Sequence, residues 1–226
     1  MLKKWKKIPH NMKNERVKEY YSILEKKKIS LFLKRFLDLL FALLLLVILL
    51  PLFILISIAI KIDSKGPVMF RQVRITQYGR KFRIFKFRTM VNNAHELGSQ
   101  VTVKNDNRVT KIGKLIRNCR LDEIPQLLNI IAGDMTFVGT RPEVEKYVNE
   151  YTNEMMVTLL LPAGVTSEAS IKYKDEKNIL TSVKNVDETY LNIVLPGKMK
   201  YNISSIKNFS VFNDFKTIIK TIVAII

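Results

Sequence analysis

Residues 117–128 read RNCRLDEIPQLL, and the fold is expected to be organised around them. Two adjacent carboxylates, Asp122 and Glu123, follow two arginines and precede a short apolar run that Pro125 is placed to start. Proline is favoured in the first turn of a helix because its missing N–H would have no partner there. The pattern therefore predicts a helix from near Ile124 to Ile131, with both acids at its N-terminal end.

This acid pair has two interpretations. Neighbouring residues in a turn point in different directions, so Asp122 could attack an electrophile while Glu123 holds a metal ion. The start of a helix also favours negative charge, from a side chain or from a bound phosphate. The alternative is a capping pair ahead of a core helix, which is the common case before a leucine-rich helix. The dipeptide alone does not decide between them.

Composition points to an anionic partner. The 226 residues can hold one sizeable core, and 38 Lys and Arg against 20 Asp and Glu give a formal net charge of +18. Such a charge suits nucleic acid, an anionic membrane or phosphorylated substrates. No sequence-reading nucleic-acid module is found, so a nucleic-acid partner is not expected. The single cysteine, Cys119, excludes an internal disulfide and fits a compartment facing the cytosol.

A membrane segment is predicted upstream of the acid pair. No residue from Leu39 to Ile60 is charged, and a helix needs roughly 20 apolar residues to cross a hydrocarbon core. Pro51 lies in the middle and favours a kink. Basic residues flank both ends, which places both flanks on the cytoplasmic side. We therefore predict a re-entrant helix–kink–helix over 34–62, with a single bent span as the alternative.

The segments on either side complete the predicted domain organisation. Residues 1–33 form a basic extension with interleaved Trp5, Tyr20 and Tyr21. This composition suits contact with the cytoplasmic leaflet, and the alternative is a disordered solubilising tail. Residues 63–226 are predicted to form one cytosolic domain.

A basic hairpin is predicted directly after the membrane segment. Its arms are Phe70–Ile75 and Lys81–Phe87, joined by a turn at 77–79. Lys86 and Arg88 could pair with phosphate oxygens. The alternative is an interfacial strand whose long basic side chains snorkel from an apolar face, and both interpretations can hold.

Further elements are predicted along the rest of the chain. Pro142 ends a glycine-punctuated loop and would stiffen the placement of Arg141, although a turn with one exposed arginine is the simpler interpretation. The C-terminal segment is an amphipathic helix that packs on the core or lies in the membrane surface. The predicted ranges are a polar helix and loop at 92–106, a basic amphipathic helix at 108–117, a helix at 145–161, a turn at 162–165 and the C-terminal helix at 209–226.

In this order, the pieces resemble the bacterial sugar transferases known as monotopic phosphoglycosyl transferases, which act on polyprenyl phosphate. The resemblance runs from Lys34 to about Thr221. It rests on KRFLD at 34–38, the apolar segment with Pro51, GPVMFRQ at 66–72, FKFRTM at 85–90, LDEIPQL at 121–127, GDM at 133–135, and the VG and RP pairs at 138–139 and 141–142.

The resemblance implies an α+β fold, in which a membrane-embedded re-entrant hairpin joins a small, mainly helical catalytic domain with a short β-hairpin and amphipathic interfacial helices. It implies an enzyme on the cytosolic face of the bacterial inner membrane. The implied reaction transfers a phospho-sugar from a UDP-sugar to undecaprenyl phosphate and releases UMP, as the first membrane step of glycoconjugate synthesis. Membrane lipid is a further implied partner, and the resemblance leaves room for a homodimer.

Residue roles follow from the same resemblance. Asp122 matches the nucleophile that forms a covalent phospho-sugar intermediate, and Glu123 matches the residue that helps to hold Mg2+. The other matched residues are Arg117 near the phosphates, Arg141 and Pro142 near the nucleotide, and Lys86 and Arg88 on the basic strand.

The sequence departs from the family pattern at three places and leaves two rival hypotheses. Thr140 replaces a proline before Arg141, which could loosen that arginine, and Ser205 stands where the branch with simple acetamido-sugar substrates usually has tyrosine. After Pro162 the usual Gly-Ile-Thr is replaced by AGVT at 163–166, which leaves the register of that turn open. One rival is a single-pass protein with its globular part outside the cell, and the other is a catalytically silent basic membrane adaptor. Such an adaptor has no physical need for the acid pair behind Arg117.

Overall fold

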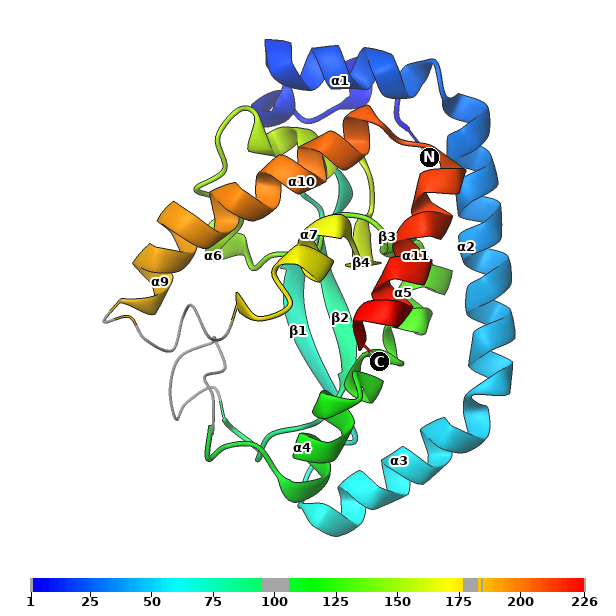
Figure 1. The fold of residues 1–226 in the computed structure, drawn as a ribbon, viewed down its shortest axis with the longest axis vertical. Helices are drawn as coiled ribbons and strands as arrows, with labels where there is room; N and C mark the ends of the chain where they lie inside the picture. The colour runs from blue at the N-terminus through cyan, green and yellow to red at the C-terminus, as the bar shows by residue number, and fades with distance from the viewer. Residues whose placement is uncertain (1, 95–105, 177–182, 184, 226) are drawn as a thin grey trace.

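The structure, a computed structural model, describes residues 2–94, 106–176, 183 and 185–225. Helices dominate, and two small two-stranded sheets complete the fold, so the predicted α+β class is confirmed (Figure 1). The helix and loop predicted over 92–106 fall mainly on residues outside the described ranges.

A long bent helix pair forms one side of the molecule. Helix α2 spans Lys28–Ile48 and α3 spans Leu50–Asp63, and their axes are bent by 61°. Pro51 lies in the first turn of α3, which confirms the predicted kink, and α2 begins earlier than the predicted residue 34. Figure 1 shows the pair running down the right side and along the lower edge, in blue and cyan.

Many side chains of α2 and α3 are both apolar and exposed to solvent. Within the described part of the chain, neither helix alone is long and apolar enough to cross a membrane, whereas the two together are, by length and composition. Val47 is 72% exposed and Leu55 is 64% exposed. A continuous exposed apolar surface of this kind needs a partner or a membrane to cover it.

The predicted hairpin is confirmed. Strand β1 (Met69–Ile75) pairs antiparallel with β2 (Lys81–Phe87), so that Met69 faces Phe87 and Ile75 faces Lys81. Tyr78 and Gly79 make the turn with φ values of 61° and 72°. Glycine tolerates such values freely, whereas Tyr78 is held in place by burial.

Helix α5 (Gln126–Ala132) packs on β2 and fixes the acid pair beside it. It begins at Pro125 as N-cap, close to the predicted start. The Asn129 side chain accepts a hydrogen bond from Phe85 N at 2.9 Å and donates one to Arg83 O at 2.9 Å. These bonds join the helix to the strand that carries Lys86.

A second sheet was not predicted. Strands β3 (Met135–Val138) and β4 (Ala163–Thr166) pair in parallel, so the turn predicted at 162–165 is wrong. The pairing needs a close approach of two glycines. A Cβ on Gly164 would lie 2.2 Å from Gly139 N, which excludes any larger residue there.

The single helix predicted at 145–161 is also wrong. The chain forms α6 (Glu145–Val148) and then the 3₁₀ segment η5 (Met155–Leu160). Thr152 Oγ1 accepts a hydrogen bond from Met155 N at 3.3 Å between them. Side chains of this kind compete with helical backbone bonds, and this explains the interruption.

The basic N-terminal extension is ordered over residues 2–27, so the disordered-tail alternative does not hold there. It contains η1 (Trp5–Lys7), η2 (His10–Met12) and α1 (Glu15–Glu25), and Asn14 caps α1 by accepting from Val17 N at 2.9 Å. Its buried side chains belong to one core cluster with η5 and α10 (Leu195–Lys207).

The remaining helices lie before and after the acid pair in the chain. The predicted basic helix is α4 (Lys111–Asn118), which is followed by the 3₁₀ turn η4 (Leu121–Glu123). The predicted C-terminal helix is α11 (Val211–Ile225), which packs on α2 and β3 while Phe212 and Phe215 stay exposed. Between β4 and α10 lie α7 (Glu168–Lys172), α9 (Val186–Thr189) and the π-helical turn η6 (Tyr190–Val194).

Candidate active site

The acid pair lies in a sharp connection between two helices. Helix α4 ends at Asn118, and the chain reverses through Arg120, whose φ of 57° is left-handed. Asp122 and Glu123 then occupy η4, just before α5. The connection holds Asp122 at 8% exposure, buried between the helices rather than free on a loop.

Glu123 is held by two cations from distant parts of the chain. Lys86 Nζ on β2 lies 2.7 Å from Glu123 Oε1. Arg141 Nη2, from the loop after β3, lies 2.5 Å from the same oxygen, and Arg141 Nη1 lies 3.4 Å from Oε2. The structure thus brings together three of the predicted site residues, Lys86, Glu123 and Arg141. Arg141 is held by Glu123 even though Thr140 replaces the proline before it.

The two carboxyl groups have opposite electrostatic environments. Burial raises the pKa of Asp122 above its ordinary value, against the opposing charges of Lys86 and Arg117. Burial acts in the same direction on Glu123, but the charges of Arg141 and Lys86 hold its pKa well below its ordinary value. Adjacent acids with pKa values shifted in opposite directions suit two different chemical roles.

The other cations at the site are partly desolvated. Burial lowers the pKa of Lys86, and the charge of Glu123 opposes that shift. Burial also lowers the pKa of Arg117, in the last turn of α4, and here the charge of Asp122 opposes it. Positive charge therefore surrounds the acid pair from β2, α4 and the loop after β3.

The remaining predicted residues lie outside this cluster. Arg88 is buried and donates to the carbonyl oxygens of Ser64 at 2.6 Å and Lys65 at 3.0 Å. It caps the C-terminal end of α3, so the structure does not place it with Lys86, and its phosphate role stays a prediction. Pro142 is buried, and its carbonyl accepts a hydrogen bond from Arg74 Nη1 at 3.4 Å.

A cavity of about 640 Å³ opens beside Glu123 and Arg141. Its walls differ in character. The apolar wall comes from α2, α5, β3 and α11, and the polar wall comes from α7, the residues after it, and α10. The main apolar lining residues are Leu45, Leu49, Leu127, Phe137 and Ala224, and the main polar ones are Ser170, Lys174, Asp175, Glu176 and Lys198.

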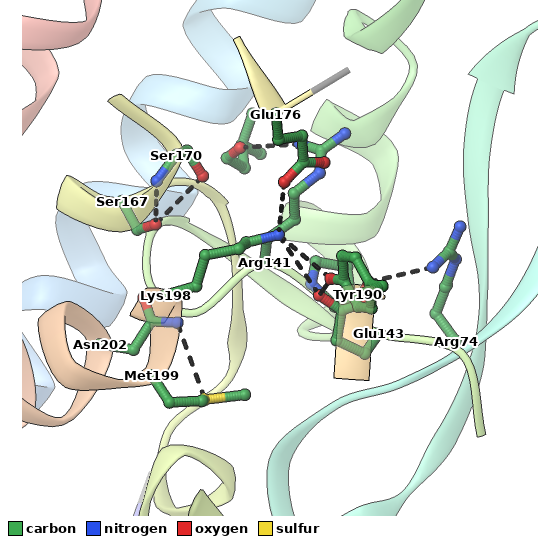
Figure 2. A network of polar contacts seen from close by, with 12 residues as sticks. Arg74, Arg141, Glu143, Ser167, Ser170, Glu176, Tyr190, Lys198, Met199 and Asn202 are labelled. Carbon is green, nitrogen blue, oxygen red and sulfur yellow. Dashed lines mark hydrogen bonds and ion pairs between the residues drawn. The ribbon is translucent and has the colours of Figure 1, made fainter. Parts of the chain in front are cut away.

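The polar wall contains a buried network that sequence reasoning did not assign to the site. Figure 2 shows Glu143, Glu176 and Tyr190 converging on Lys198. Lys198 Nζ lies 3.1 Å from Glu176 Oε2 and 3.6 Å from Glu143 Oε1, and Tyr190 donates to Glu143 at 2.5 Å. The available signal was a lysine inside the apolar run LPGKM at 195–199.

The acid pair could bind Mg2+ only together with a ligand that carries phosphate groups. Among the described residues, no group of three or more His, Cys, Asp or Glu side chains could hold a metal ion. Mg2+ usually takes one or two carboxylates together with substrate phosphates and water, so Asp122 and Glu123 could suffice. Lys86 and Arg141 both make their short contacts to Oε1 of Glu123, which leaves Oε2 as the oxygen that would face the ion.

Comparisons with known proteins agree with this chemistry. The sequence pattern of the family described as "Bacterial sugar transferase" matches residues 29–226. A UDP-N-acetylgalactosamine-undecaprenyl-phosphate N-acetylgalactosaminephosphotransferase of Aeromonas hydrophila is 34% identical over 194 residues, which cover 84% of this chain and 43% of that protein. A UDP-glucose:undecaprenyl-phosphate glucose-1-phosphate transferase of Klebsiella pneumoniae is 31% identical over 198 residues, covering 86% and 40%.

A shorter relative matches along more of its own length. A putative undecaprenyl-phosphate N-acetylgalactosaminyl 1-phosphate transferase of Bacillus subtilis is 38% identical over 135 residues, which cover 60% of this chain and 75% of that protein. The chain spans about two fifths of the length of the Aeromonas and Klebsiella relatives. The names of these three relatives share undecaprenyl phosphate, and two of them name N-acetylgalactosamine whereas the Klebsiella relative names glucose.

Proposed function

The chain belongs to the bacterial sugar transferase family, and from that premise we propose that it transfers a phospho-sugar from a UDP-sugar to undecaprenyl phosphate and releases UMP. The observation that carries the proposal is the acid pair itself. Two adjacent carboxyl groups with opposite pKa shifts lie among three cations, beside a cavity with one apolar and one polar wall. A lipid phosphate and a sugar nucleotide need such a combination of surfaces.

In the first step Asp122 acts as the nucleophile. A carboxylate oxygen of Asp122 attacks the phosphorus that bears the sugar, and the bond from that phosphorus to the bridging oxygen breaks. UMP leaves with the bridging oxygen and its electron pair. The raised pKa of Asp122 keeps its ionised carboxylate basic, which favours attack, while the nearby cations keep that ionised form accessible.

In the second step the acceptor completes the transfer. A phosphate oxygen of undecaprenyl phosphate attacks the same phosphorus, and the bond from phosphorus to the Asp122 oxygen breaks. The products are a polyprenyl diphosphate sugar and the regenerated carboxylate. Asp122 therefore returns to its starting ionisation state after each cycle.

Lys86, Arg117 and Arg141 would neutralise phosphate charge in both steps. When bound, Mg2+ would be held by Glu123, next to Asp122, and would supply further neutralisation of the diphosphate. Arg141 lines the cavity and Lys86 lies behind Glu123, so the two cations can act from different sides of the acid pair.

The bent pair of α2 and α3 would set the membrane position. Its exposed apolar side chains suit insertion into the hydrocarbon, and the basic residues at both ends suit the cytosolic interface. We propose that the pair is a re-entrant hairpin, with the domain on the cytosolic face of the inner membrane. This arrangement brings the cavity to the level of the acceptor phosphate.

The test is to mix the full chain with a UDP-sugar in the absence of undecaprenyl phosphate. UDP-N-acetylgalactosamine and UDP-glucose are the donors to try first, given the relatives' names. We expect up to one UMP per protein and a mass increase equal to one phospho-sugar. Asp122→Asn should abolish both and lower turnover by about a thousandfold or more.

A matched control is Asp187→Asn, since Asp187 is a half-exposed acid that pairs with Lys146, is not among the cavity lining residues, and accepts a hydrogen bond from Tyr147 that the amide oxygen of asparagine can still accept. It should behave as the unaltered protein does. Turnover in the presence of acceptor without any covalent adduct, or full activity of the Asp122→Asn variant, would refute the assignment of the nucleophile.

A further inference from the structure

Gln126 is a buried polar side chain that has no partner. It is 1% exposed, and neither its Nε2 nor its Oε1 forms a hydrogen bond with any described residue. Buried amide groups in folded proteins are nearly always satisfied, by protein, by water or by a ligand. Gln126 is also one of the residues that line the cavity beside Glu123.

Its position along the chain places it one turn from the nucleophile. Ile124 and Pro125 both have right-handed helical backbone angles, and α5 begins at Gln126 itself. Gln126 therefore follows Asp122 by four residues, at the start of the helix that comes directly after the acid pair. A group held by the Gln126 amide would therefore lie next to the reacting phosphorus of the proposed intermediate.

The surroundings of Gln126 favour a lipid ligand. Helix α5 packs against α2, and the cavity wall here contains Leu45 and Leu49 from α2 together with Leu127. The polar network around Lys198 belongs to the wall built by α7 and α10. A sugar has hydroxyl groups that suit the second wall, whereas an isoprenoid chain suits the first.

We propose that the Gln126 amide binds the phosphate head of the polyprenyl phosphate acceptor, with the first isoprenoid units lying against Leu45 and Leu49. The Nε2 group donates to a phosphate oxygen, and Arg141, which also lines the cavity, supplies the positive charge. The inference rests on the proposed function and assigns to that reaction the binding site of its second substrate.

The two half-reactions separate this site from the donor site. Donor cleavage needs no acceptor, so Gln126→Leu should keep the UMP burst and the covalent phospho-sugar mass within about twofold. The concentration of undecaprenyl phosphate that gives half-maximal turnover should rise about 10- to 100-fold, as expected for loss of one hydrogen bond to a charged group. Gln126→Glu should show at least the same loss, because a carboxylate repels the phosphate.

A binding measurement makes the test independent of turnover. Undecaprenyl phosphate in detergent micelles should raise the thermal unfolding midpoint of the unaltered protein, and undecaprenol, which lacks the phosphate, should raise it less. Gln126→Leu should abolish this difference between the two lipids. Gln126→Asn provides a second variant if the leucine variant does not fold, and Asn192→Leu, at an exposed amide outside the cavity lining, is the matched control.

Each result bears on the proposal. An unchanged acceptor dependence in a folded Gln126 variant would overturn it. Loss of the donor burst in a folded variant would also overturn it, since Gln126 would then belong to the donor site. Failure of the proposed function looks different, because the unaltered protein would give no UMP burst while the difference between the two lipids could still be measured.

Discussion

At the scale of single residues, neighbouring acids differ because their partners differ. Glu123 is paired with Lys86 and Arg141, which hold its pKa well below the ordinary value, whereas burial raises the pKa of Asp122. Glu123 therefore stays charged over the whole working pH range. The pKa of Asp122 is the one that can govern how activity falls in acid, since only an ionised carboxylate attacks phosphorus.

The first prediction concerns the pH dependence of Lys86→Met. As the proposed nucleophile, Asp122 would have to be ionised to react, so the rate of UMP release should fall as the pH drops through its raised pKa. The charge of Lys86 lowers that pKa, so its removal should move the acid limb to higher pH. The measurement is the single-turnover rate of UMP release against pH.

Two variants serve as controls for that shift. Lys86→Arg keeps the cation and should leave the acid limb close to its original position. Lys81→Met removes an exposed lysine of the same strand that pairs with Glu145, and it should have no effect. An acid limb that stays in place or moves to lower pH in Lys86→Met would contradict the proposed role of Asp122.

Sequence reasoning identified the acids and several cations but not every contact. Asp122, Glu123 and Arg141 belong to short sequence motifs, and the chemistry of each motif can be recognised from neighbouring residues alone. The placement of Arg88 could not be recognised in that way, because its partners are carbonyl groups at the end of α3. The unsatisfied amide of Gln126 was equally hidden, since burial and the lack of a partner appear only in three dimensions.

At the scale of elements, the proline kink and the hairpin turn were predicted correctly, whereas the helix at 145–161 and the non-local strand pairing were not. Pro51 fixed the break between α2 and α3, because proline acts on its own backbone and on the preceding turn. The turn at 77–79 likewise fixed the β1–β2 hairpin. The parallel strands β3 and β4 are short and lie far apart in the chain. They can pair only because Gly139 and Gly164 approach each other closely, and no local sequence pattern reveals that approach.

The second prediction tests whether the basic extension is part of the main core. Leu24 on α1 is fully buried in the cluster shared with α10, the helix that carries Lys198. Leu24→Ala should lower the free energy of unfolding by roughly 2–5 kcal/mol, through lost burial and the cavity left behind. Denaturant unfolding of the full chain in detergent measures this change.

The same helix offers a matched control. Lys18 lies on the exposed face of α1, and Lys18→Ala should change the free energy of unfolding by less than about 0.5 kcal/mol. Equal effects of the two substitutions would contradict the packing of α1 on α10. A stable Leu24→Ala variant with full activity would further show that the extension does not support the wall around Lys198.

At the scale of the whole molecule, the bent pair is part of the site. Lys34 Nζ lies 2.6 Å from Asp214 on α11 and donates to Val138 O at 3.0 Å. Arg35 donates to the carbonyl groups of Ile130 at 2.6 Å and Ile131 at 3.1 Å, at the end of α5. These contacts fix α2 against the domain, so Leu45 and Leu49 hold their places in the cavity wall. Movement of the bent pair relative to the domain would therefore change the cavity directly.

The third prediction follows from this arrangement and concerns topology. If α2 and α3 form a re-entrant hairpin, residues on both sides of the pair face the cytosol. Lys26 and Lys65 are exposed and flank the pair, and Cys119 is the single cysteine. In a Cys119→Ser background, Lys26→Cys and Lys65→Cys should both resist a membrane-impermeant thiol reagent in intact spheroplasts and react after permeabilisation.

A straight span places the two sites on opposite faces, so reaction of one of them in intact spheroplasts would contradict the hairpin. The unaltered Cys119 gives the internal check, because it lies in the connection that leads to Asp122 and must share the face on which the UDP-sugar is used.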